Sequence, residues 1–147
     1  EMNKQEILNI VKTKLAEKIE NLENLIAETR ASNNETKSSM GDKYETTREM
    51  VQQEINNLQV QLNENLKANN SLKLIPLSAT KKVGFGSLVE TSNGLFYISV
   101  SLGRIENGQQ TIFLISPESP LAKTIFGKKK DDVFTINNIN QTIQNIW

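Results

Sequence analysis

Residues 38–45 read Ser-Ser-Met-Gly-Asp-Lys-Tyr-Glu, and Gly41 is the only glycine or proline in residues 1–75. On both sides of Gly41, apolar residues recur at steps of three and four, which is the spacing of an amphipathic helix. These residues are Ile7, Val11, Leu15, Ile19, Leu22 and Ile26 before the glycine and Val51, Ile55, Leu58, Leu62 and Leu66 after it. Two such helices bury their apolar stripes by folding back on each other. The pattern therefore predicts an antiparallel coiled-coil hairpin with residues 38–45 at its tip.

The first helix is predicted over about residues 4–31, and the second helix ends near residues 69–70. The stretch 32–39 lacks apolar residues and is rich in turn formers, so the turn is expected there or just after it. Asp42 is placed to cap the second helix, with Glu45 three positions later.

The pair Asp42 and Glu45 has two interpretations. An acidic residue followed by a glutamate three positions on is a common capping arrangement at a helix start. The same spacing puts both carboxylates on one helix face, where their oxygens can hold a hard cation such as Mg²⁺. Two carboxylates bind Mg²⁺ weakly, so the second interpretation requires another molecule to complete the coordination shell.

The chain changes character at Pro76, where a β pattern begins. The expected strands are Val83–Glu90, Leu95–Leu102, Thr111–Ser116, Val133–Ile136 and Thr142–Trp147. Asn93-Gly94 and Asn107-Gly108 are turn signals between such runs. The sequence predicts an α+β protein, with a helical hairpin over 1–75 and a small antiparallel sheet domain over 76–147.

One short helix is expected to pack on this sheet. Ser119 is the predicted N-cap, Pro120 the first helical residue and Gly127 the stop signal. Gly84 and Gly86, on either side of a phenylalanine, indicate a bend or a close backbone approach at the start of the first strand.

Composition excludes several classes of function. The chain has 17 basic and 17 acidic residues and contains neither cysteine nor histidine, so disulfides, thiolate metal sites and imidazole catalysis are ruled out. Residues 1–70 carry 9 basic and 12 acidic side chains, and residues 71–147 carry 8 and 5, which suits two different contact surfaces. No apolar run approaches about 18 residues, so a soluble, cytoplasmic protein without a membrane partner is expected.

Three blocks of the second half resemble the C-terminal, FKBP-like domain of the Gre transcription elongation factors of bacteria. They are VGFGSLV at 83–89, ISPESPLA at 115–122 and GKKKDDV at 127–133. Gre factors also have an N-terminal antiparallel coiled coil whose tip reads G-D-x-x-E, and Gly41, Asp42 and Glu45 match it in register. The resemblance covers nearly the whole chain in the same order.

The resemblance implies that the protein binds RNA polymerase at its secondary channel and stimulates cleavage of backtracked transcripts. In Gre factors the tip carboxylates, here Asp42 and Glu45, help to hold the polymerase's second Mg²⁺ and a water near the nascent RNA. Ser119, Pro120 and Leu121 fall in the block that docks on the polymerase, although helix cap and core are equally open roles for them. The protein is then a monomeric accessory factor, not an enzyme, with no stably bound cofactor.

The tip departs from the family pattern. Gre tips continue GDLSENAEY, whereas residues 43–47 here read Lys-Tyr-Glu-Thr-Thr and lack the asparagine after the glutamate. The coiled coil is also shorter than in the longest members. A regulator that occupies the channel without stimulating cleavage is therefore an alternative. Tyr44 and Arg48 have two open roles, contact with RNA or plain solvation.

Two other classes of protein each fit one part of the sequence. An FKBP-like fold raises the possibility of a prolyl isomerase, which needs a pocket lined by aromatic residues. The aromatic residues here are scattered singly along the sequence and suit a core better than such a pocket. They are Phe85, Phe96, Tyr97, Phe113, Phe126 and Phe134. A coiled-coil interaction protein fits the hairpin but leaves the C-terminal blocks unexplained. Lys128-Lys129-Lys130 is either a charged turn or an electrostatic contact with nucleic acid.

Overall fold

The computed structural model describes residues 2–39 and 45–147, and side chains over 2–32 and 46–147. The chain forms two compact units. One consists of Leu15–Asn69, and the other combines the residues up to Lys14 with Asn70–Trp147. The α+β fold class predicted from the sequence is confirmed, because two long helices are followed by a sheet with one short helix.

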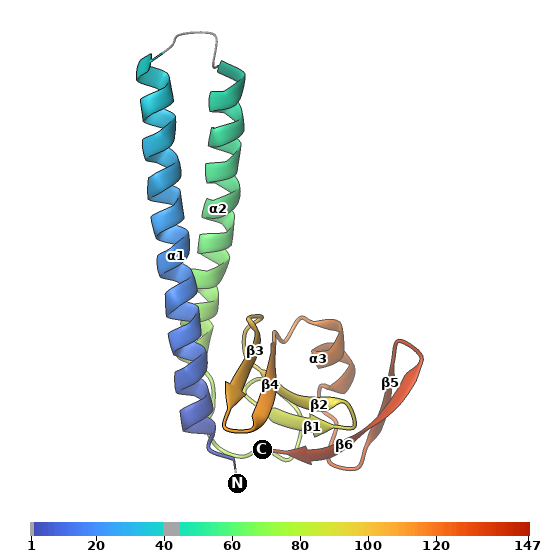
Figure 1. Cartoon of the computed structure of the whole chain (residues 1–147). Coiled ribbons are helices and arrows are strands. Elements are labelled where there is room, and N and C mark those ends of the chain that lie inside the picture. Colours follow the sequence, from blue (N-terminus) through green and yellow to red (C-terminus); the bar gives the residue numbers. More distant parts are fainter. Residues whose placement is uncertain (1, 40–44) are drawn as a thin grey trace. The chain divides into compact units, whose positions relative to one another are not determined.

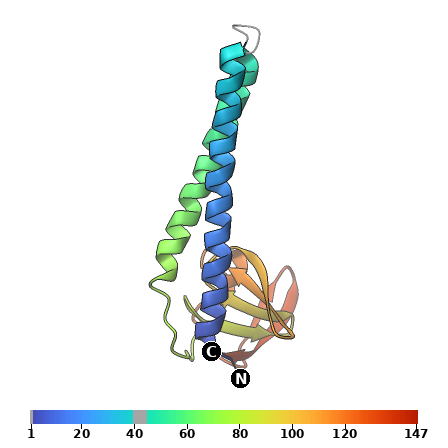
Figure 2. The ribbon, with the colours of Figure 1, turned by 60° about the vertical axis from the view of Figure 1, so that its left-hand side comes forward.

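The helical unit contains most of α1 (Lys4–Ser39) and most of α2 (Glu45–Leu72), and the two helices run side by side in both views (Figures 1 and 2). Its buried cluster contains Leu22, Ile26, Ile55, Leu58 and Leu62, with Ile19 and Val51 packed against it. Each such side chain contributes about 1.5–3 kcal/mol on burial, whereas side-chain pairs on the exposed face contribute a few tenths. The apolar seam therefore holds the hairpin together, as predicted. Leu66 is an exception, because 41% of it is exposed.

The first helix is longer than predicted. α1 continues through residues 32–39 to Ser39, beyond the expected end near Ala31, and α2 ends at Leu72. Serine, asparagine and threonine cost only about half a kcal/mol each in a helix, and extending a formed helix avoids the cost of nucleation. The polar stretch therefore prolongs the helix instead of ending it. The predicted cap Asp42 lies outside the described residues.

The second unit contains a six-stranded mixed sheet in the order β3-β4-β2-β1-β6-β5 (Figure 1). The strands are β1 (Leu88–Thr91), β2 (Gly94–Ile98), β3 (Gly103–Asn107), β4 (Gln110–Ile115), β5 (Val133–Ile136) and β6 (Ile139–Ile146). Neighbouring strands are antiparallel except β2 and β4, which pair in parallel from Leu95↔Ile112 to Ile98↔Ile115. The expectation of a purely antiparallel sheet was therefore wrong at this one pair. The unpredicted edge strand β3 forms a hairpin with β4, and this reverses the direction of β4 next to β2.

The three hairpin turns of the sheet are formed around asparagine and glycine residues. The turn after Asn107 is confirmed, and Gly108 adopts φ +65° there. Between β1 and β2 the loop is Ser92-Asn93, one residue earlier than expected, because Thr91 already pairs with Gly94. β5 and β6 are joined by Asn137-Asn138 with φ +53° and +64°, the left-handed pair that a tight hairpin turn requires.

The sheet has a core on each face. On one face α3 (Pro120–Ile125) packs over a cluster formed by Val83, Val89, Ile98, Ala122, Ile125, Phe134 and Ile143. Alternation along the strands puts the buried pair Leu88 and Tyr97 on the opposite face. The first turns of α1 belong to this unit: Ile7 and Val11 are fully buried, and Lys14 Nζ donates to the Arg104 carbonyl of β3 at 2.8 Å. The start of α1 is thus part of the sheet unit.

Tyr97 gives a prediction about stability and pH. Its side chain is fully buried, its Oη has no hydrogen-bond partner among the described residues, and burial raises its pKa to about 12. In the unfolded chain this phenol ionises near pH 10. Because the unfolded chain loses this proton first, the free energy of unfolding is unaffected below pH 10 and falls as the pH rises from 10 towards 12.

We expect Tyr97→Phe to be as stable as the unchanged protein at pH 7, or more stable by up to about 1 kcal/mol, because an unsatisfied hydroxyl is removed. The variant should therefore unfold at the same or a higher urea concentration. Above pH 10 the advantage of the variant should grow to about 2 kcal/mol, since the phenylalanine cannot ionise. Urea unfolding of both proteins at pH 7, 10 and 11.5 measures this difference. A variant that is clearly less stable at pH 7 would mean that the hydroxyl has a favourable partner.

Candidate functional site

The predicted tip pair lies at the connection of the two helices. α1 ends at Ser39 and α2 begins at Glu45, so Asp42 belongs to the five connecting residues, which are outside the described part of the chain. Glu45 is the first residue of α2, but its side chain is also outside the description. Tyr44 is also outside the described residues, whereas Arg48 is described and half-buried. The metal-side role of Asp42 and Glu45 remains a prediction.

Elsewhere the described residues offer no competing metal centre. Over 2–32 and 46–147, no group of three or more acidic side chains is arranged to hold a metal ion. In the described part of the chain, no helix is both long and apolar enough to cross a membrane.

The block Ser119-Pro120-Leu121 builds the start of α3. Ser119 has an extended backbone, and its Oγ accepts a hydrogen bond from Ala122 N at 3.2 Å, which confirms its role as N-cap. Pro120 occupies the first turn, where its missing N–H costs nothing, and its side chain is exposed. Leu121 is half-buried and packs against the core under α3. Docking by these three residues remains a prediction, and of the three only Pro120 is largely exposed.

The end of α3 adds a residue that the sequence did not single out as a contact. Phe126 was predicted to be core, but it is 63% exposed. It is the C-cap, with φ −54° and ψ 129°, so its backbone leaves the helical path and its side chain is not carried onto the buried face of Ala122 and Ile125. An exposed aromatic ring is typical of a protein contact site. We call Pro120, Lys123 and Phe126, all exposed at three-residue spacing, the α3 surface.

The lysine run that follows α3 forms a closed turn. Lys129 N donates to Asp132 Oδ2 at 2.8 Å, and Asp132 N donates back to the Lys129 carbonyl at 3.1 Å. Asp131 between them has φ +74°. Lys129 and Lys130 are exposed. The aspartates of this block therefore shape the turn, and contact of the lysines with nucleic acid remains a prediction.

The VGFGSLV block is a structural turn. Gly84 N donates to the buried Ser87 Oγ at 2.9 Å, and this oxygen also bonds Thr80 Oγ1 at 2.9 Å. At Gly86, with φ +87°, a Cβ would lie 2.8 Å from Pro76 Cδ, so the predicted close approach is confirmed there. This turn is why β1 begins at Leu88 and not at Val83.

Comparison with known proteins gives a structural likeness alone. No family model matches the chain, and no curated protein matches it. Similar solved structures are the transcription factor Gfh1 (18% identity, 90% of this chain and 89% of the other, TM-score 0.38) and GreA factor homolog 1 (Gfh1) of Thermus thermophilus (18%, 92% and 94%, 0.37). Gfh1 of Thermus aquaticus is also similar (18%, 91% and 92%, 0.37). At these TM-scores the likeness supports no further step, and the proposals below are drawn from the chain's own residues.

Proposed function

We propose that this protein is a Gre-like transcription elongation factor that binds RNA polymerase at the secondary channel and stimulates cleavage of backtracked transcripts. The observation that carries the proposal is the hairpin itself. The first helix, α1, ends at Ser39, and the second, α2, begins at Glu45. An aspartate, Asp42, and a glutamate, Glu45, therefore fall at the connection between them. The same chain continues into a sheet unit with the SPLA block at the start of α3.

The donor chemistry of the tip fits this role. Carboxylate oxygens are the ligands that Mg²⁺ prefers, and two of them leave most of its octahedral shell to other donors. Such a pair suits an ion that is held jointly with the polymerase's own active site. Asp42 and Glu45 would supply the charge on one side of that ion and orient a water near the nascent RNA. The polymerase performs the cleavage, and this protein is an accessory factor in the cytoplasm.

A second candidate is a regulator that occupies the channel without stimulating cleavage. The sequence of the tip favours it, because residues 43–47 lack the asparagine that follows the glutamate in Gre factors. Both candidates require binding to RNA polymerase, but only the first requires shortening of the transcript.

A halted elongation complex distinguishes the two. The complex carries a labelled, backtracked transcript, and the core polymerase comes from the source organism. Transcript shortening that depends on the added protein supports the cleavage factor. Binding with slower elongation and no shortening supports the second candidate. Absence of binding would reject both and favour a coiled-coil interaction protein.

The α3 surface gives a prediction about docking. We expect Phe126→Ala to weaken polymerase binding by about tenfold, because exposed aromatic residues often carry much of the binding energy of an interface. Its effect on stability should be small, since the ring is 63% exposed. Leu121→Ala is a poorer test because Leu121 also packs against the core.

The matched control is Leu74→Ala, which removes an 80% exposed apolar side chain elsewhere in the same unit. Binding to immobilised core polymerase measures both variants, and circular dichroism checks their folding. If Phe126→Ala binds as tightly as the unchanged protein, docking does not use the α3 surface.

A further inference from the structure

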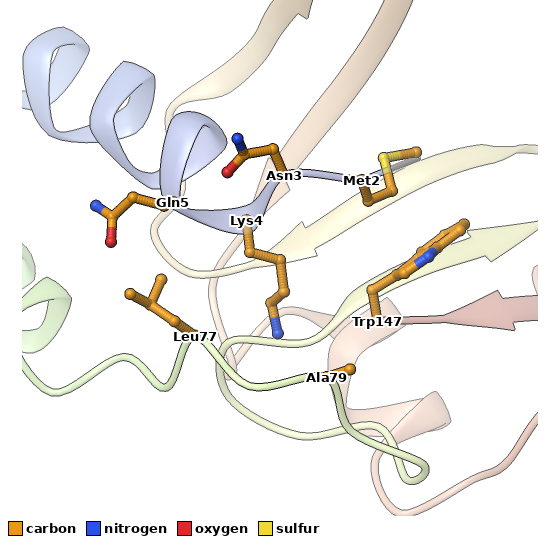
Figure 3. A pocket seen from close by; sticks show the side chains of 7 residues that line it. All are labelled: Met2, Asn3, Lys4, Gln5, Leu77, Ala79 and Trp147. Atoms are coloured by element: carbon orange, nitrogen blue, oxygen red, sulfur yellow. The ribbon is translucent and has the colours of Figure 1, made fainter.

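A pocket of about 590 Å³ opens within the sheet unit (Figure 3). The start of α1, the segment before β1 and the residue after β6 contribute to it. Its lining residues are Met2, Asn3, Lys4, Gln5, Leu77, Ala79 and Trp147. This volume lies within the range of sites that bind small molecules, which is roughly 300–1,000 Å³.

Lys4 is the one cation among the residues that line this pocket. Its side chain is only 7% exposed, and its Nζ donates to the Ser78 carbonyl at 3.0 Å. An ammonium group has three donors, and within the described residues this is its one hydrogen-bond partner. Burial lowers the pKa of Lys4 because the charged form is desolvated. A buried charge of this kind is best stabilised by an anion.

The rest of the lining combines the polar amides of Asn3 and Gln5 with apolar and aromatic side chains. Leu77 and Ala79 lie near the end of the Lys4 side chain, and the Trp147 ring borders the same space (Figure 3). The backbone of Trp147 is held by the sheet, since its N donates to the Leu88 carbonyl at 2.8 Å and its carbonyl accepts from Leu88 N at 3.1 Å. The pocket therefore combines one buried positive charge with an aromatic side chain whose backbone is fixed by the sheet.

We propose that this pocket binds a small monocarboxylate with a flat apolar body. The carboxylate accepts hydrogen bonds from Lys4 Nζ, and the body lies against Trp147 and Leu77. A single lysine neutralises one negative charge, which favours a monocarboxylate over a phosphate dianion. The inference does not depend on binding to RNA polymerase.

Trp147 is the only tryptophan of the chain, so its fluorescence reports on the pocket directly. The probe is benzoate, and the control ligand is benzamide, which has the same shape without the charge. We expect a saturable change in emission with benzoate at a Kd of about 0.1–10 mM, as is typical of a ligand of this size. Benzamide should bind about tenfold more weakly.

Two variants test the role of the charge. Lys4→Met keeps the length of the side chain and should weaken benzoate binding about tenfold, whereas Lys12→Met, at an exposed position of the same helix, should leave it unchanged. If Lys4→Met fails to fold, ¹⁹F NMR of 4-fluorobenzoate with the unchanged protein and with Trp147→Phe replaces it, and the tryptophan variant should bind more weakly. Three results would each overturn the proposal: no saturable response, equal binding of benzamide, or competition by inorganic phosphate as effective as that by benzoate.

Discussion

Elongation complexes supplied with the Asp42→Asn or Glu45→Gln variant are expected to retain their backtracked transcripts at nearly full length. Either change keeps the shape of the side chain and removes one of the charges proposed to hold the polymerase's second Mg²⁺. Loss of groups that merely support a metal ligand already costs about 10- to 100-fold, so loss of a ligand should slow transcript shortening by about a hundredfold. The rate of shortening in a halted complex measures this effect.

Four controls separate metal binding from folding and docking. The hairpin should lose no more than about 1 kcal/mol, the value of an exposed helix cap, and polymerase binding should stay near that of the unchanged protein. Glu49→Gln removes the same charge from an exposed position one turn along α2 and should leave shortening intact. Raising the Mg²⁺ concentration should partly restore the weaker tip variant. If Glu49→Gln is as damaging as Glu45→Gln, general charge at this end of α2 is responsible.

The helical hairpin was predictable because its signal is local. Steps of three and four between apolar residues define a helical stripe, and only a partner stripe covers it. The same periodicity does not show whether a given part of the stripe is buried against the other helix or against the sheet. Ile7 and Val11 continue the stripe without a break, yet they are buried in the unit that contains the sheet. The pattern of Leu66 likewise does not reveal that it is 41% exposed.

The sheet was harder to predict where strands lie at an edge or begin in a polar stretch. β3 contains only Ile105 as a large apolar residue, because an edge strand needs to cover little surface. The start of β6 was missed for a similar reason, since its first exposed residues carry no alternation. Lys4 gave no signal at all. A lysine in a first helical turn is ordinary, and only tertiary packing shows that it is buried.

A protein with a shortened hairpin is expected to bind RNA polymerase but not to shorten transcripts. The change removes residues 27–54 and joins Ile26 to Ile55 through a short glycine-rich turn. All five residues of the buried cluster between the helices are retained, because Ile26 and Ile55 are its members nearest the tip in sequence. About 13 residues are lost from α1, which shortens the hairpin by about 20 Å. The deletion also removes Asp42 and Glu45, so the shortened protein has no tip carboxylates to share the polymerase's metal ion.

This deletion separates docking from activity more cleanly than removal of the whole hairpin, residues 1–70, would. The larger deletion also removes Ile7 and Val11, which are fully buried in the sheet unit, so a loss of binding would then reflect unfolding. Equilibrium binding to core polymerase and transcript shortening are measured for the same preparation of the shortened protein, with folding checked by circular dichroism. Binding without shortening assigns docking to the sheet unit and activity to the distal hairpin. Shortening at the original rate would show that the tip carboxylates are not required, and a folded protein that no longer binds would place docking on the hairpin.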